Sequence, residues 1–138
     1  MEDRDRAKQV TAAILLRGRE VFIAQRPPGD RLAFRWEFPG GTVEEGETPE
    51  ACLKREMEEE FGIQVQVLSF FARSLYRYDH GLIDLQAYRV RWTGGRLQPR
   101  VHAAVAWVPI SRLDRYDLAP ADRPFVQKLR CELDTKRK

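Results

Sequence analysis

Three glutamates near the middle of the chain carry the side chains best suited to chemistry. Glu59 and Glu60 follow Glu56 by three and four residues. On a helix with 3.6 residues per turn, this spacing places all three carboxylates within an arc of about 100°. Converging carboxylate oxygens are the ligands that Mg²⁺ and Mn²⁺ prefer. The sequence therefore predicts a divalent-metal site, and a solvent-exposed acidic face is the alternative interpretation.

The energetic cost of this arrangement favours the metal site. Like charges three or four residues apart destabilise a helix by about 0.2–0.5 kcal/mol per pair, and acids near a helix C-terminus oppose the macrodipole. Arg55 directly precedes the acids and could orient a carboxylate through a charge-assisted hydrogen bond. The turn formed by Pro39, Gly40 and Gly41 would let backbone approach the same ion or a phosphate.

The helix that positions these glutamates has clear start and end signals. Thr48 is a suitable N-cap, Pro49 fits the first helical position, and Gly62 is the residue type expected just past the end. These signals predict a helix over residues 49–61. A buried stripe with a spacing of four runs beside the glutamates and comprises Leu53, Met57 and Phe61.

The distribution of charge separates this segment from the rest of the chain. The net charge is +3, but residues 44–60 hold eight acidic and two basic residues, so the segment carries −6 and the remainder +9. A local acidic site inside a basic protein suits a polyanion held through metal ions at one place and through Arg and Lys around it. Nucleic acid would also suit such a field.

Length and composition predict one domain without a membrane segment. The 138 residues suffice for a single core, and we expect residues 1–138 to form one domain with flexible tails at about 1–8 and 134–138. No apolar run approaches the roughly 20 residues that span a bilayer. The charged start, MEDRDRAKQ, lacks the apolar stretch of a secretory signal, and Cys52 and Cys131 form no framework spacing. A cytoplasmic location is expected.

The remaining patterns alternate strands with a second helix. Apolar runs at 9–16 and 21–25 predict a hairpin, 36–38 a short strand, 63–78 and 82–92 two long paired strands, and 103–110 a further strand. Residues 120–133 predict a helix with Asp122 as its N-cap and with Phe125, Leu129 and Leu133 spaced four apart. This order indicates one mixed α/β layered domain of the α+β type.

Gly41, Glu47 and the run from Arg55 to Ile63 resemble the Nudix box, G-x5-E-x7-R-E-U-x-E-E-x-G-U with U aliphatic, at every fixed position. The resemblance continues outside the box. The segments AQRP (24–27), WEFPGG (36–41) and LAPADRP (118–124) resemble the MutT-type branch of the family, and the last is especially similar to bacterial CTP pyrophosphohydrolases.

The resemblance implies both a fold and a reaction. It implies the Nudix fold, a mixed β-sheet sandwiched between α-helices, and a Mg²⁺-dependent hydrolase, with Mn²⁺ as a second candidate cofactor. The implied reaction splits a nucleoside triphosphate into a nucleoside monophosphate and pyrophosphate. CTP, dCTP or 8-oxo-dGTP would be the substrate. No stable nucleic-acid partner is expected, and a monomer or a homodimer would both be compatible.

The resemblance also implies roles for individual residues. The metal ligands would be the Gly40 carbonyl, Glu56, Glu59 and Glu60. The catalytic residues would be Glu47, Arg55, Glu56 and Glu59. The substrate would contact Arg26, Glu37, Phe38, Pro39, Gly40, Gly41 and Asp122. Asp122 would read the base, because an aspartate can accept a hydrogen bond from the exocyclic amine of cytosine, and when protonated it could also serve an oxidised guanine.

One position differs from the residues typical of the MutT-type branch. Relatives carry a glutamate, a candidate metal ligand or general base, where this chain has Val101. His102 is adjacent and could take a proton or bind metal, but a lone histidine in a loop is expected to be solvent-exposed. The general base therefore stays open between Glu56 and a water activated by the metal.

Two rival functions remain compatible with the sequence. One is a Nudix-like module that binds a nucleotide or a damaged base without cleaving it, which the basic remainder and Val101 would favour. The other is an enzyme acting on nucleotide sugars or dinucleoside polyphosphates. The costly carboxylates of the box argue against the first, and the LAPADRP segment argues against the second.

Overall fold

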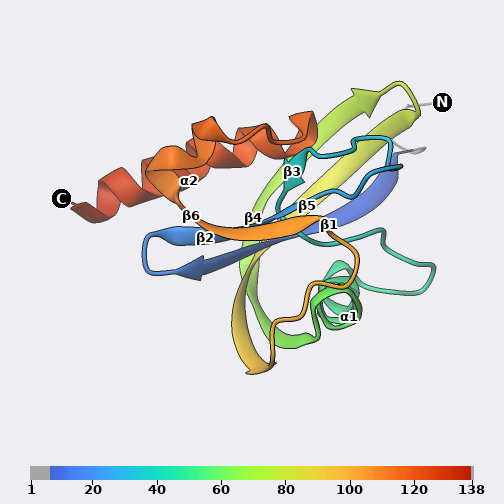
Figure 1. Cartoon of the computed structure of the whole chain (residues 1–138), viewed down its shortest axis with the longest axis horizontal. Helices are drawn as coiled ribbons and strands as arrows, with labels where there is room; N and C mark the ends of the chain where they lie inside the picture. The colour runs from blue at the N-terminus through green and yellow to red at the C-terminus, as the bar shows by residue number, and fades with distance from the viewer. Residues whose placement is uncertain (1–6, 138) are drawn as a thin grey trace.

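A mixed six-stranded sheet lies between two helices in the computed structural model, which describes residues 7–137 (Figure 1). The elements are β1 (Lys8–Arg17), β2 (Glu20–Gln25), β3 (Trp36–Glu37), α1 (Pro49–Phe61), β4 (Ile63–Tyr78), β5 (Gly81–Gly95), β6 (Ala104–Pro109), the 3-10 helices η2 (Ile110–Arg115) and η3 (Pro120–Asp122), and α2 (Arg123–Arg137). The strand order is β3-β2-β1-β5-β4, with β6 paired to β2. The predicted α+β class, with a mixed sheet between helices, is confirmed.

Strand β1 is buried on both faces because it separates two hydrophobic cores. Ala12 and Ile14 face the core that α2 covers, whereas Ala13 and Leu15 face the core that α1 covers. This alternation follows from the two-residue period of a strand, so a strand with helices on both sides needs apolar residues at successive positions. All four side chains are at most 2% exposed.

The predicted hairpin between 9–16 and 21–25 exists only at its turn. Strand β1 pairs with β2 at Leu16↔Val21 and Arg17↔Glu20. Over the rest of its length it pairs in parallel with β5, from Lys8↔Ile83 to Leu15↔Val90. Strand β2 pairs along its whole length with β6 instead. Strand β1 therefore joins the two halves of the sheet, and the two long strands β4 and β5 pair antiparallel as predicted.

Helix α1 begins and ends where the sequence predicts. The Thr48 side chain accepts a hydrogen bond from the Ala51 N–H at 3.1 Å, Pro49 occupies the first turn, and Gly62 ends the helix at φ 72° in the left-handed region. The buried residues are Cys52, Leu53, Met57 and Phe61. The predicted stripe is thus confirmed.

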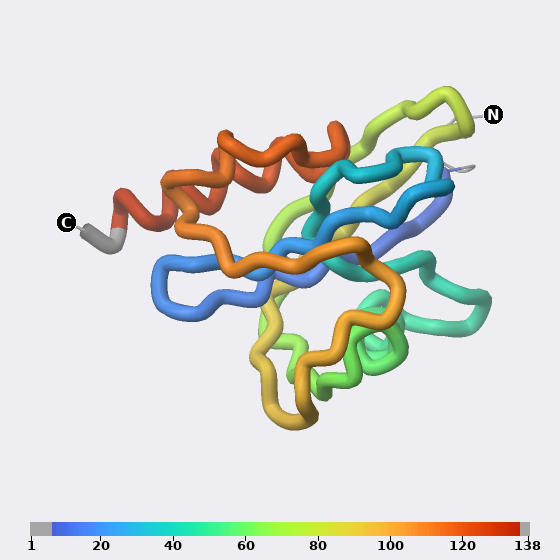
Figure 2. The backbone as a smooth tube through the Cα atoms, viewed as in Figure 1, coloured from blue at the N-terminus to red at the C-terminus, as the bar shows by residue number. Residues whose placement is uncertain are grey.

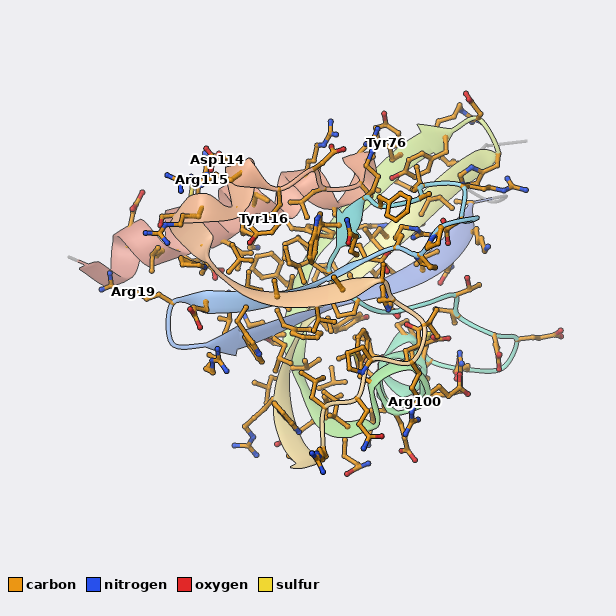
Figure 3. All side chains as sticks on the ribbon, viewed as in Figure 1. Arg19, Tyr76, Arg100, Asp114, Arg115 and Tyr116 are labelled. Carbon is orange, nitrogen blue, oxygen red and sulfur yellow. The ribbon has the colours of Figure 1, made fainter. Side chains whose placement is uncertain are left out.

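Charge from a distant segment compensates the acidic end of α1. The last turn of α1 contains no basic residue. The segment after β5 runs beside α1 (Figure 2), and the Nη1 atom of Arg100 donates to the carbonyl oxygens of Glu58 and Glu59 at 3.0 and 3.3 Å. Figure 3 shows Arg100 next to α1. A cation at these carbonyls offsets the unfavourable interaction of the acids with the macrodipole.

The predicted boundaries shift at both ends of the chain. Lys8 pairs with Ile83 in β1, and α2 continues past Leu133 to Arg137, so these two elements extend into the stretches predicted as tails, 1–8 and 134–138. Residues 1–6 and 138 lie outside the described part. The expected N-cap Asp122 points elsewhere: its Oδ1 accepts a hydrogen bond from the Phe38 N–H at 3.1 Å. Within residues 7–137, no helix is long and apolar enough to cross a membrane.

Candidate active site

A cavity of about 990 Å³ opens between several segments. These are the Arg26–Leu32 loop, the turn of Pro39, Gly40 and Gly41 (the glycine turn), α1, the tip of the β4–β5 pair and η3. Its size matches that of sites for small-molecule ligands. Some of its lining residues are acidic, and others are apolar or aromatic. The acidic ones include Asp30, Glu37, Glu44, Glu56, Glu60 and Asp122, and the apolar or aromatic ones include Tyr78, His80, Ile83, Leu85, Ala119 and Ala121.

The glycine turn lies against β1. The carbonyls of Pro39 and Gly41 accept hydrogen bonds from the Ala13 and Thr11 N–H groups at 2.6 and 2.8 Å. A Cβ atom at Gly40 would lie 1.9 Å from the Thr11 carbonyl oxygen. Because carbonyls alternate along an extended segment, the Gly40 carbonyl points away from β1. The two flanking bonds thus set the orientation expected of a backbone ligand.

Gly41 lets the backbone approach a carboxylate of α1. A Cβ atom at Gly41 would lie only 2.2 Å from Cδ of Glu56. Any other residue would displace that carboxylate. Gly41 therefore leaves room for the carboxylate of Glu56. The sequence predicted a turn at Gly41 but not this close approach.

Arg55 orients acids both in the loop before α1 and on α1 itself. Its Nε and Nη2 atoms donate to the two carboxylate oxygens of Glu47 at 2.7 and 3.0 Å, and its Nη1 donates to Glu56 at 2.8 Å and to Glu59 at 3.2 Å. The bond from Arg55 lowers the pKa of Glu47 to about 2. Glu47 in turn accepts a bond from the Glu44 N–H at 3.0 Å, so the loop before α1 is tied to Arg55.

Glu60 is the most unusual acid of the cavity. Its Oε1 atom is buried and has no hydrogen-bond partner among the described residues. Burial, together with the charges of the nearby Glu56 and Glu37, raises the pKa of Glu60 to about 7, although His102 acts in the opposite direction. A buried carboxylate oxygen without a partner is costly, so Oε1 of Glu60 is suited to bind a ligand.

The predicted metal ligands lie only partly around the cavity. Glu56 and Glu60 line it together with Gly40, but the side chain of Glu59 is 59% exposed and paired to Arg55. Among residues 7–137, no three His, Cys, Asp or Glu side chains form a ready-made ligand group. The residues present nevertheless fit a hard divalent cation, because an unpartnered buried carboxylate oxygen, a second carboxylate and a free carbonyl face one space.

A network of ion pairs also lines the cavity. Arg26 donates from Nε and Nη2 to Asp30 at 2.8 and 3.0 Å and from Nη1 to Oε1 of Glu37 at 2.8 Å. The second oxygen of Glu37 lies 2.7 Å from Nε2 of His102. The expectation that His102 is solvent-exposed is wrong: its side chain is only 4% exposed and stacks on Phe61.

Asp122 and Phe38, both predicted to contact the substrate, occupy different environments. Asp122 lines the cavity and is buried, and desolvation raises its pKa well above the usual value, with a further contribution from the charge of Glu37. The Phe38 ring is 2% exposed and packs near Phe125 in the core. Phe38 therefore holds Asp122 through its backbone N–H rather than offering an open aromatic face.

Several cavity residues carry no signal in the sequence. Thr11 is buried and donates from its hydroxyl to the Gly41 carbonyl, and Asp30 and the tip residues Tyr78 and His80 reach the cavity only through tertiary structure. The rings of Tyr78 and His80 stack at 5.2 Å. The sequence pointed to His102 only because it is next to Val101, the position that differs from the MutT-type pattern.

Comparison with known proteins gives consistent results. Residues 7–129 match the model of the NUDIX domain. The chain is 41% identical over 125 residues to a putative 8-oxo-dGTP diphosphatase 2 of Mycobacterium tuberculosis, covering 87% of this chain and 86% of the relative. It is 37% identical over 119 residues to the CTP pyrophosphohydrolase of Escherichia coli, covering 86% and 88%. The solution structure of the E. coli ORF135 protein superposes with a TM-score of 0.78 at 36% identity, covering 89% of each chain.

Proposed function

Because this chain belongs to the NUDIX family and is a hydrolase of it, we propose that it is a nucleoside triphosphate pyrophosphohydrolase that requires Mg²⁺ or Mn²⁺. Its products would be a nucleoside monophosphate and pyrophosphate. The observation that carries the proposal is the cavity itself, which is lined both by Glu60, whose buried Oε1 atom has no partner among the described residues, and by the buried Asp122. The triphosphate would lie at Glu60, the acidic end, and the base at Asp122, the base-side end.

The acidic end supplies the groups that the reaction needs. Glu56, Glu60 and the Gly40 carbonyl would hold the divalent cation, which when bound neutralises charge on the phosphoryl oxygens. Arg55 orients Glu56 through one carboxylate oxygen. The other oxygen is then available to a cation or to a proton of the attacking water. Burial raises the pKa of Glu56, which makes it a better proton acceptor.

Asp122, at the base-side end, could bind either cytosine or 8-oxoguanine. The raised pKa of Asp122 favours its neutral form, and a carboxylic acid both donates and accepts hydrogen bonds. Cytosine presents the ring acceptor N3 beside its amine donor, and 8-oxoguanine presents the O6 carbonyl acceptor beside an N7–H donor, whereas the N7 atom of guanine only accepts. Each edge complements a neutral carboxylic acid. The names of the relatives, an 8-oxo-dGTP diphosphatase and a CTP pyrophosphohydrolase, cover the same two bases.

A pyrophosphate-release assay tests the proposal. CTP, dCTP, dGTP and 8-oxo-dGTP are offered with Mg²⁺ and with chelator. We expect Mg²⁺-dependent release from a cytosine nucleotide or from 8-oxo-dGTP, with dGTP as the poorer substrate. Glu60→Gln should lose most of the turnover, whereas the matched control Glu58→Gln, on the exposed side of α1, should keep it.

Two outcomes would contradict the proposal. Binding of the nucleotides without any release of pyrophosphate would support a non-catalytic binding module. Release of sugar phosphates or of longer nucleotide products, from nucleotide sugars or dinucleoside polyphosphates, would retain the hydrolase and change its substrate class.

A further inference from the structure

We infer that His102 is a positioning residue that fixes Glu37 and, through Glu37, the guanidinium of Arg26, so that Arg26 presents N–H groups to a phosphate in the cavity. The inference rests on the proposed function in its last step, since it gives Arg26 an anionic ligand. Its first step, the fixing of Glu37, stands on geometry alone.

Glu37 is held at both of its oxygens by different partners. Oε1 accepts from Nη1 of Arg26 at 2.8 Å, and Oε2 lies 2.7 Å from Nε2 of His102. Glu37 forms an ion pair with Arg26, and a carboxylate only accepts hydrogen bonds, so we assign Nε2 of His102 as the donor. The side chains of Glu37 and His102 are 16% and 4% exposed, so water competes little for these bonds. The carboxylate plane is therefore fixed.

The imidazole itself has little freedom. Its ring stacks on Phe61 of α1 with centroids 5.1 Å apart and planes at 18°. On either side, the backbone N–H of Arg100 donates to the Glu60 carbonyl and that of Ala103 to the Gln25 carbonyl, each at 2.9 Å. The segment carrying His102 is thus attached both to α1 and to β2. A rigid donor of this kind can set the orientation of its acceptor.

The hydrogen bonds of Arg26 show why this orientation matters. Three of its five N–H groups donate to Asp30 and Glu37, which leaves one N–H on each terminal nitrogen. Arg26 lines the cavity, so these two groups suit a phosphate. Without His102, Glu37 could turn and engage Arg26 with both oxygens. That bidentate pair would occupy an N–H group that the substrate needs.

Two substitutions of His102 distinguish a role in positioning Glu37 from a role that depends only on the size of the side chain. In His102→Gln the amide nitrogen reaches about as far as Nε2, whereas in His102→Asn it is too short to reach Glu37. We expect His102→Asn to raise the KM for the nucleotide about tenfold or more, with a smaller change in kcat, and His102→Gln to stay within about threefold of the wild type. A merely structural role would affect both variants alike and would not act mainly on KM.

Nitrogen NMR gives a readout that needs no substrate. The chain has two histidines, His80 and His102. In a sample labelled with ¹⁵N at histidine, we expect His102 to show a hydrogen-bonded Nε2–H that exchanges slowly, whereas the exposed His80 should exchange fast. The His102 signal should lose this protection in Glu37→Ala.

The outcomes are distinguishable from failure of the proposed function. Equal KM values for both His102 variants, a loss confined to kcat, or an Nε2–H that exchanges as fast as that of His80 would overturn the inference. If the wild type releases no pyrophosphate, the proposed function fails. The inference is then decided by calorimetric titration with α,β-methylene-CTP, where an equal dissociation constant for wild type and His102→Asn would overturn it.

Discussion

Replacing Glu60 with glutamine should stabilise the fold at alkaline pH in the absence of metal. Burial, with the charges of Glu56 and Glu37, raises the pKa of Glu60 from 4.5 to about 7. Between these values the unfolded chain has released a proton that the folded state still holds, so stability falls as pH rises through this window. Above it the ionised carboxylate costs the folded state at most about 3 kcal/mol, because one pKa unit corresponds to about 1.4 kcal/mol.

Thermal unfolding followed by circular dichroism measures this cost. In metal-free buffer near pH 8.5, we expect the Tm of Glu60→Gln to exceed that of the wild type by up to about 9 °C, given about 3 °C per kcal/mol for a domain of this size. Near pH 5 the difference should be small. Glu58→Gln, which removes an exposed charge from the same turn, should show little pH-dependent difference.

The reasoning would be refuted by a Tm difference that stays constant between pH 5 and 8.5, or by a less stable Glu60→Gln at pH 8.5. Added Mg²⁺ gives a second check. A cation that binds only the folded state raises its Tm by mass action, so Mg²⁺ should stabilise the wild type more than the variant. An equal shift for both would show that Glu60 contributes nothing to cation binding.

Three further substitutions test the surroundings of the site. Gly41→Ala should displace the Glu56 carboxylate and reduce kcat about 100-fold with the fold retained, and an unchanged kcat would contradict the close approach. Arg55→Lys should lower the urea midpoint at neutral pH, because lysine cannot replace the paired bonds to Glu47. Since the pKa of Glu47 is depressed to about 2, the difference from the wild type should shrink as pH falls from 4.5 toward 2. A difference that does not depend on pH would contradict this prediction. Arg100→Ala should cost about 1 kcal/mol of stability, measured by urea unfolding, and should not alter KM.

Local patterns were enough to predict most elements of the fold. Thr48, Pro49 and Gly62 predict the limits of α1 because capping depends on a few neighbouring residues, and the structure has the helix at the same residues. The long strands β4 and β5 follow from alternation around a glycine-containing turn. Partners distant in sequence were not predictable: β1 pairs with β5 across more than 70 residues, whereas the neighbouring apolar runs predict a local hairpin.

The sequence by itself determined the type of chemistry, since the spacing of Glu56, Glu59 and Glu60 on one helix face depends only on the helical repeat. Tertiary structure decided which of them face the cavity: Glu59 is exposed and paired with Arg55, whereas Glu60 lines the cavity and its Oε1 atom is buried without a hydrogen-bond partner among the described residues. It also decided the surroundings of His102, because the bond to Glu37 joins residues 65 positions apart that meet only when the segment after β5 folds over α1.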